Sequence, residues 1–154
     1  MIEYLVRQYT DNIDVCTNGQ DFLRVKRKFN FWGKLISKFY LDDKLILETT
    51  YNVSFFKKYL TIELQDLPKQ VELNYSKRIY YLRYENSLLK IKRKYFKNPQ
   101  YQFYVNDVMV GEVEGKLNEL VESPKCYNIL FYEKNEFNFY FILFFIMGLD
   151  ATIA

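Results

Sequence analysis

The sequence predicts an all-β domain with one helix, arranged as an antiparallel barrel of about twelve strands that encloses a hydrophobic C-terminal helix. Three observations predict this fold. Tyr and Phe, which favour strands, occur 15 and 14 times, whereas Ala, the best helix former, occurs only at Ala151 and Ala154. Short runs alternate apolar and polar residues, and one later segment is apolar on every side. The 154 residues suit one domain, so we expect a single domain over residues 1–154.

The strand prediction rests on alternation with a period of two residues. In residues 59–65, Leu60, Ile62 and Leu64 face one way and the polar residues between them face the other. A spacing of roughly ten residues per strand is typical of a meandering antiparallel sheet or barrel. Counting such runs gives eleven candidate strands, near residues 4–9, 22–30, 34–41, 45–53, 59–66, 70–75, 78–85, 88–96, 101–106, 108–114 and 126–133.

Short polar pairs between these runs predict hairpin turns, because Asn and Asp tolerate left-handed backbone geometry. The predicted turns are Asp42-Asp43, Glu85-Asn86, Asn98-Pro99 and Asn106-Asp107. The glycines at positions 111 and 115 follow a strand without opening a phosphate-binding helix, so we expect a bulge or strand end there. Residues 117–122 could form one turn of helix.

Residues 137–149 behave differently from the rest of the chain. The uninterrupted apolar run from Phe139 to Leu149 has eleven residues and is closed by Asp150. As a helix it would be about 16 Å long, roughly half the hydrocarbon thickness of a bilayer, so it is too short to span one. Periodicity alone would equally suit a central strand. A barrel of about eleven or twelve strands needs an apolar filling, which favours a buried central helix.

Charge is distributed unevenly along the chain. The net charge is +3, but residues 107–154 carry eight acids and three bases, which leaves +8 on residues 1–106. Two segments have only basic charged residues, namely residues 22–41 with six and residues 86–106 with five. Such asymmetry can attract nucleic acid or an anionic membrane. The alternatives are a solvated outer face of basic strands, or a fold in which the C-terminal acids neutralise the bases.

The absence of histidine excludes Ser-His-Asp and Cys-His nucleophile systems, His-ligated zinc and histidine proton shuttles. Cys16 and Cys126 lie in unlike contexts with no metal-ligand spacing, so we expect two free thiols. The first residues have no apolar stretch of signal-peptide length. We therefore expect a cytoplasmic protein, which could bind peripherally at a membrane.

Catalytic motifs are missing as well. No glycine-rich phosphate loop and no nucleophile-elbow motif occurs. Glu112 and Glu114 share one face of a strand, and Glu119 and Glu122 follow. Paired carboxylates can act as acid and base in glycosidases, but without a partner constellation we interpret these as surface acids. We predict that the protein is not an enzyme, with no catalytic residues, no cofactor and no bound metal.

Several segments together resemble the tubby-like superfamily, which includes the tubby C-terminal domain, the plant LURP-one-related proteins and the phospholipid scramblases. Residues 79–94 and 101–113 resemble its consecutive strands, in which basic residues end one strand and a glycine closes a later one. Residues 34–62 resemble earlier hairpins, and residues 137–149 occupy the place of the family's hydrophobic C-terminal helix. The resemblance covers residues 22–150 and implies a twelve-stranded barrel threaded by that helix. Tubby domains bind phosphoinositides, but their ligand residues do not match positions here one by one. The scramblase calcium ligands are not evident either, because Asp42-Asp43 suits a turn.

Basic strands interleaved with aromatic residues supply the candidate site. If the two basic strands are neighbours, their outward cations form one patch that could hold phosphate groups of lipid or RNA. The predicted anion-binding patch consists of Arg24, Lys26, Lys28, Lys90, Lys92 and Lys94. Trp32, beside Gly33, could stack a ligand, but we expect it to be a core or rim aromatic.

The favoured function is a non-enzymatic module that binds an unidentified protein partner. The alternative is a module for anionic phospholipid headgroups of the phosphoinositide type. Nucleic acid is disfavoured by the small net charge. We lean to protein interaction because the C-terminal acids could pair with the basic strands and cover the patch.

Overall fold

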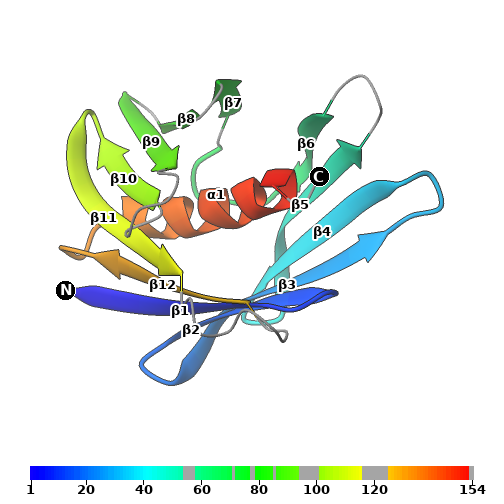
Figure 1. Ribbon diagram of the computed structural model, residues 1–154, viewed down its shortest axis with the longest axis horizontal. Coiled ribbons are helices and arrows are strands. Elements are labelled where there is room, and N and C mark those ends of the chain that lie inside the picture. The colour runs from blue at the N-terminus through cyan, green and yellow to red at the C-terminus, as the bar shows by residue number, and fades with distance from the viewer. Residues whose placement is uncertain are drawn as a thin grey trace.

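The structure is a computed structural model that describes residues 1–53, 58–70, 72–76, 79–84, 86–93, 101–115 and 125–152. Twelve strands precede one helix (Figure 1). The strands are β1 Ile2–Gln8, β2 Asn12–Thr17, β3 Gln20–Phe29, β4 Lys34–Leu41, β5 Lys44–Val53, β6 Lys58–Gln65, β7 Glu72–Ser76, β8 Ile79–Tyr84, β9 Ser87–Arg93, β10 Tyr101–Val105, β11 Val108–Gly115 and β12 Lys125–Phe131. The helix α1 is Phe137–Thr152. The predicted fold class, β strands with a single C-terminal helix, is confirmed.

All twelve strands belong to one antiparallel sheet in the order β6-β5-β4-β3-β2-β1-β12-β11-β10-β9-β8-β7. The sheet curves around α1 (Figure 1). Among the described residues, β6 and β7 at its two ends form no hydrogen-bonded pair, so closure into a barrel stays a prediction. The connection between these ends is tied to the helix, because the Lys69 backbone N–H donates to the Tyr140 hydroxyl at 3.1 Å.

One strand was not predicted from the sequence. β2, Asn12–Thr17, lies between the first two predicted runs. Its Ile13 and Val15 are buried, while its polar residues face outward, and it is joined to β3 by a turn at Asn18 and Gly19 with φ values of 52° and 74°. A short strand with Asn and Asp on its outer face has the composition of a loop, which is why the alternation was missed.

The hairpin turns are formed by the residue types that the turn geometry requires. Asp42 and Asp43 have φ values of 49° and 63°, and Asn106 and Asp107 have 46° and 68°. Positive φ at both central residues is the signature of the two-residue turns that match strand twist, so these two predicted turns are confirmed. Asn86 lies in the turn before β9, but Glu85, Asn98-Pro99 and residues 117–122 fall outside the described residues.

A bulge occurs at the predicted glycine segment. Phe103 pairs with Gly111 and Tyr104 pairs with Met109, so Val110 is an extra residue on β11. A Cβ at Gly111 would lie 2.6 Å from the carbonyl oxygen of Leu130 on β12, which only glycine avoids. β11 then ends at Gly115. The interpretation of this segment as a bulge and strand end is confirmed.

The helix α1 begins at Phe137, as predicted, and extends three residues beyond the predicted end at Leu149. The Asn135 side chain accepts a hydrogen bond from the Phe137 backbone N–H at 3.1 Å and so caps the first turn. The one polar residue in the apolar run, Asn138, is buried and donates its amide to the Glu133 carbonyl at 3.0 Å. That bond offsets the cost of burying an amide.

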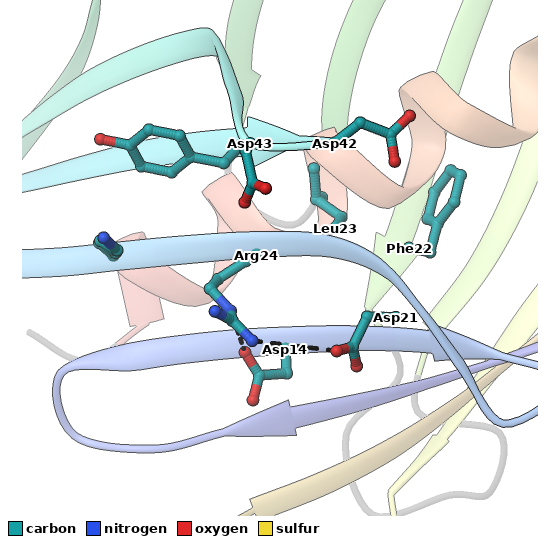
Figure 2. A pocket seen from close by; sticks show the side chains of 9 residues that line it. Asp14, Asp21, Phe22, Leu23, Arg24, Asp42 and Asp43 are labelled. Carbon is teal, nitrogen blue, oxygen red and sulfur yellow. Dashed lines mark ion pairs between the residues drawn. The ribbon is translucent and has the colours of Figure 1, made fainter.

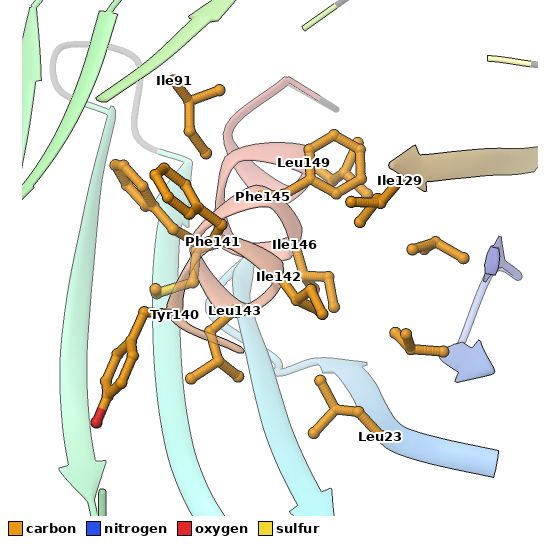
Figure 3. Packing of buried hydrophobic residues seen from close by; sticks show 14 of the residues in the cluster. Leu23, Ile91, Ile129, Tyr140, Phe141, Ile142, Leu143, Phe145, Ile146 and Leu149 are labelled. Carbon is orange, nitrogen blue, oxygen red and sulfur yellow. The ribbon is translucent and has the colours of Figure 1, made fainter. Parts of the chain in front are cut away.

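The core forms where α1 meets the inward side chains of the strands (Figure 3). Phe141 and Phe144 are 0% and 1% exposed, as the sequence predicted. Phe103 of β10 stacks on Phe141 with ring centroids 4.8 Å apart. Each large side chain buried in this way contributes roughly 1.5–3 kcal/mol. The helix is therefore the centre of the domain, and both basic strands rest on the same core.

Candidate anion-binding surface

The structure does not bring the five described cations of the predicted patch together. Arg24, Lys26 and Lys28 lie on β3, and Lys90 and Lys92 lie on β9. Lys94 falls outside the described residues. Strands β2, β1, β12, β11 and β10 separate β3 from β9 in the sheet, which is roughly 29 Å along it at about 4.8 Å per strand. The condition for one patch, that the two strands are neighbours, is not met.

The cations of β9 are partly buried, unlike Lys26 and Lys28 of β3, which are exposed. Lys90 Nζ lies 3.0 Å from Asp107 Oδ1, and the Lys90 side chain is only 17% exposed. Lys92 Nζ lies 4.9 Å from the centroid of the Tyr104 ring. Asp107 belongs to the β10–β11 turn, whose Asn106 side chain accepts a hydrogen bond from the Leu88 backbone N–H. This turn therefore holds an acid against β9, as we expected the C-terminal acids to do.

Near the start of β3, the positive charge of Arg24 is also balanced by acids. Arg24 Nε lies 3.5 Å from Asp14 Oδ1, and its Nη2 lies 3.9 Å from Asp21 Oδ2. These residues line a pocket of about 320 Å³ together with Lys26, Tyr40, Asp42 and Asp43 (Figure 2). Lys26 forms no ion pair with the acids of this pocket. Arg24 thus belongs to a mixed acid–base cluster and does not add a free positive charge.

Further along β3, and on the paired strand β4, the β3–β4 hairpin carries exposed lysines that form no ion pair with a described acid. Lys26 and Lys28 of β3 point outward, and β4 adds two outward lysines because its Leu35, Ser37 and Phe39 point inward. Lys26 and Lys38 are direct cross-strand partners. We call the four residues Lys26, Lys28, Lys34 and Lys38 the basic face. Lys34 and Lys38 were counted among the bases of residues 22–41 but not assigned to the site, although the alternation of β4 would have placed them outward.

No acid among the described residues forms an ion pair with the basic face. Lys26 Nζ lies 5.2 Å from the centroid of the Tyr40 ring, a contact that leaves its charge in place. Glu48 of β5 is opposite Lys38 in register, but at a distance beyond ion-pair contact. Like charges opposite each other in a sheet cost up to about 1 kcal/mol, so an anion that neutralises Lys26 and Lys38 would relieve a repulsion.

An aromatic tip, defined as Phe31 and Trp32, lies at the end of the same hairpin. These two side chains are 95% and 80% exposed, and their rings meet edge to face at 5.8 Å. Phe29, just below them, is also exposed. Trp32 is therefore a rim residue and takes no part in the core.

Hydrogen bonds fix the conformation of this tip. The Asn30 side-chain oxygen accepts from the backbone N–H groups of Trp32 and Lys34, both at 2.9 Å. The Asn30 N–H donates to the Lys34 carbonyl at 2.8 Å, and the N–H of Gly33 donates to the Asn30 carbonyl at 3.1 Å. Gly33 has a φ of 75°, which a residue with a Cβ rarely adopts. The turn therefore holds both rings outward.

The remaining titratable groups do not form a catalytic arrangement in the part of the chain that the structure describes. Burial raises the pKa of Tyr132, and Glu112, which accepts its hydroxyl proton in a hydrogen bond, raises that pKa further. Glu114 is exposed, and Glu119 and Glu122 lie outside the described residues. Neither Cys16 nor Cys126 is in a disulfide bond. Within the described ranges, no three Cys, Asp or Glu side chains are grouped so that they could hold a metal ion.

A search of the described residues for a membrane-spanning helix finds none of sufficient length and apolarity. No protein-family model matches the chain, and comparisons with curated proteins and with solved structures find no match. The resemblance to the tubby-like superfamily stays a prediction from the sequence.

Proposed function

We propose that the protein is a non-enzymatic module that binds an anionic membrane surface through the basic face of the β3–β4 hairpin. The observation that carries this proposal is the contrast in pairing. Lys90 is covered by Asp107, whereas Lys26, Lys28, Lys34 and Lys38 are exposed, and no described acid forms an ion pair with them. Charges kept exposed on a rigid hairpin are available to the phosphate groups of lipid headgroups.

The sequence favoured a protein partner because C-terminal acids could cover the basic strands. That reasoning holds at β9 but not at β3, and it is β3 that supports the lipid alternative. Each lysine near an anionic surface is worth about 1 kcal/mol, so the basic face supplies roughly 4 kcal/mol. Such a contribution suits reversible, peripheral binding by a cytoplasmic protein. The resemblance to tubby-like domains, some of which bind phosphoinositides, supports the same function.

Vesicle sedimentation tests this proposal. The protein should sediment with vesicles of phosphatidylcholine and phosphatidylserine at about 0.01 M salt and much less at about 1 M, because the Debye length falls from about 30 Å to about 3 Å. A second set of vesicles, with a phosphoinositide replacing phosphatidylserine at equal charge, reports headgroup preference. Absence of binding to both sets at low salt would refute the proposal.

Matched double variants locate the binding surface. Lys28→Gln with Lys34→Gln removes two charges from the basic face, and we expect roughly 30-fold weaker binding from about 2 kcal/mol. Lys90→Gln with Lys92→Gln removes the same two charges from β9, and we expect little change. Equal losses in the two variants would mean that only net charge matters and that the hairpin is not the binding site.

A further inference from the structure

We infer that the aromatic tip inserts into the interfacial layer of the bilayer and anchors the hairpin that the basic face attracts to it. This inference rests on the proposed function and adds a second, salt-resistant part to the binding. It also gives the molecule one orientation on the membrane, with the end of the β3–β4 hairpin pointing into the lipid.

The exposure of the tip is the first observation. Phe31 and Trp32 are more exposed than any other large apolar side chain described except Met1. The β3–β4 hairpin that carries them extends to the edge of the molecule, at the right of Figure 1. Trp is enriched where water meets hydrocarbon, because its ring is apolar and the indole N–H still finds an acceptor, and Phe31 adds apolar area beside it.

The second observation is the spacing between the rings and the lysines. Lys28 precedes Phe31 by three residues, about 10 Å along an extended strand, and Lys34 follows Trp32 by two. The polar layer on each side of a bilayer is roughly 5–8 Å thick. With the rings at the base of this layer, the Lys28 backbone lies at or just beyond its outer edge and Lys34 lies closer to the rings. Lysine side chains can bend toward the phosphates from there.

The third observation is the turn that carries the rings. The Asn30 side chain accepts two backbone hydrogen bonds at 2.9 Å, and Gly33 takes the left-handed conformation that closes the turn. The backbone that presents both rings is ordered before any partner is present, so little backbone entropy is lost when they insert. An exposed aromatic pair on an ordered turn is suited to immediate contact with a surface.

A protein occupant fits the tip less well than a bilayer does. A stable protein interface takes about 800 Å² from each partner. Two aromatic side chains of about 150–250 Å² each, with the exposed part of Phe29 added, supply at most roughly 650 Å². Lys28 and Lys34 flank this small area along the chain, and they complement a layer of phosphates better than an apolar protein groove.

Trp32 is the only tryptophan in the chain, so its fluorescence reports the tip alone. On addition of vesicles of phosphatidylcholine and phosphatidylserine, we expect its emission to shift to the blue, aqueous iodide to quench it less, and brominated lipids to quench it more. Phe31→Ser should weaken vesicle binding by about tenfold and remove the part that persists at about 1 M salt. The matched control is Val108→Ser, at another exposed hairpin, which should bind as the unmodified protein does.

The outcomes separate this inference from the proposed function. If the protein sediments with the vesicles at low salt but the Trp32 emission does not move, insertion is refuted and electrostatic binding stands. If nothing sediments, both are refuted. If the emission shifts without vesicles as protein concentration rises, with a dimer in analytical ultracentrifugation, the tip contacts a second copy of the chain and the inference is wrong.

Discussion

Strands β3 and β9 both carry outward basic residues at every second position, but their charges meet different surroundings. On β9, Lys90 lies against Asp107 and Lys92 lies over the Tyr104 ring. On β3, Lys26 lies over the Tyr40 ring and lines the pocket that holds Asp14. Neither Lys26 nor Lys28 forms an ion pair with a described acid, and the hairpin end beyond them adds two further lysines and exposed aromatic rings. Whether the charged side chains of a strand can reach a binding partner therefore depends on the neighbouring residues in the sheet and not on the sequence of the strand alone.

The largest effect on stability is expected in the core, on which both β3 and β9 pack. Phe144→Asp places a charge in the centre of the core, which costs several kcal/mol, on the order of the whole stability of a domain. We expect no folded protein by circular dichroism and gel filtration. Phe31→Asp is the matched control and should fold with a melting temperature close to that of the unmodified chain, because its side chain is 95% exposed. A folded Phe144→Asp protein would contradict the described core.

A second change places an acid beside the lysines of β3, as Asp107 lies beside Lys90 of β9. Ile36 is the outward cross-strand partner of Lys28, so Ile36→Asp places a carboxylate beside the basic face. We expect vesicle binding to weaken by about tenfold, because one acid neutralises Lys28 and repels the phosphates. Ile36→Asn has nearly the same size without the charge and should bind as before. Equal binding by Ile36→Asp and the unmodified protein would mean that the basic face is not used.

The reverse change removes the acid that lies beside Lys90 of β9. Asp107→Asn removes the acid that pairs with Lys90 but keeps a residue type that accepts the φ of 68° at this position. Because Asp107 is largely exposed, the loss of stability should be below about 1 kcal/mol by chemical denaturation. Vesicle binding should rise by at most about twofold, since β9 lies far from the basic face along the sheet. A larger rise would show that β9 also contacts the membrane.

The smallest expected effect is on the reactivity of Cys16, whose thiol contacts Asp21 in the acid–base cluster near the start of β3. Burial raises the pKa of its thiol, and a hydrogen bond to Asp21 raises that pKa further. At neutral pH a smaller fraction is thiolate, so iodoacetamide should modify Cys16 more slowly in the folded protein than in the chain unfolded by guanidinium. Asp21→Asn should speed the folded-state reaction. Faster modification in the folded state, measured by peptide mass spectrometry, would contradict this electrostatic assignment.

Local patterns in the sequence were sufficient to predict the elements. Alternation located eleven of the twelve strands, and the wholly apolar run located the helix on which Phe141 and Phe144 are buried. Both signals depend on neighbouring residues alone. β2 was missed because Asn12 and Asp14 give a true strand the composition of a loop.

The candidate site was only half predictable, because it depends on pairing between distant strands. Whether β3 adjoins β9 follows from the order of twelve strands, and no run of residues encodes that order locally. The inward Leu35 and Phe39 could have placed Lys34 and Lys38 outward, since strand side chains alternate. Phe31 and Trp32 were harder to predict, because large aromatic residues are usually at least partly buried.

The pairing of β1 with β12 has a consequence for how the chain folds. Ile2 is the register partner of Phe131, so the first strand finds its second neighbour only after nearly all the others have been made. α1, which fills the centre, follows all twelve strands in the chain. Ten of the eleven described strand pairs join neighbours in the chain, so the β1–β12 pairing and the docking of α1 are the distant contacts, which form more slowly than local ones. On the ribosome, the inner face of the sheet would emerge before the helix that covers it. During that interval the apolar side chains of the strands would be exposed, and a chaperone could bind them.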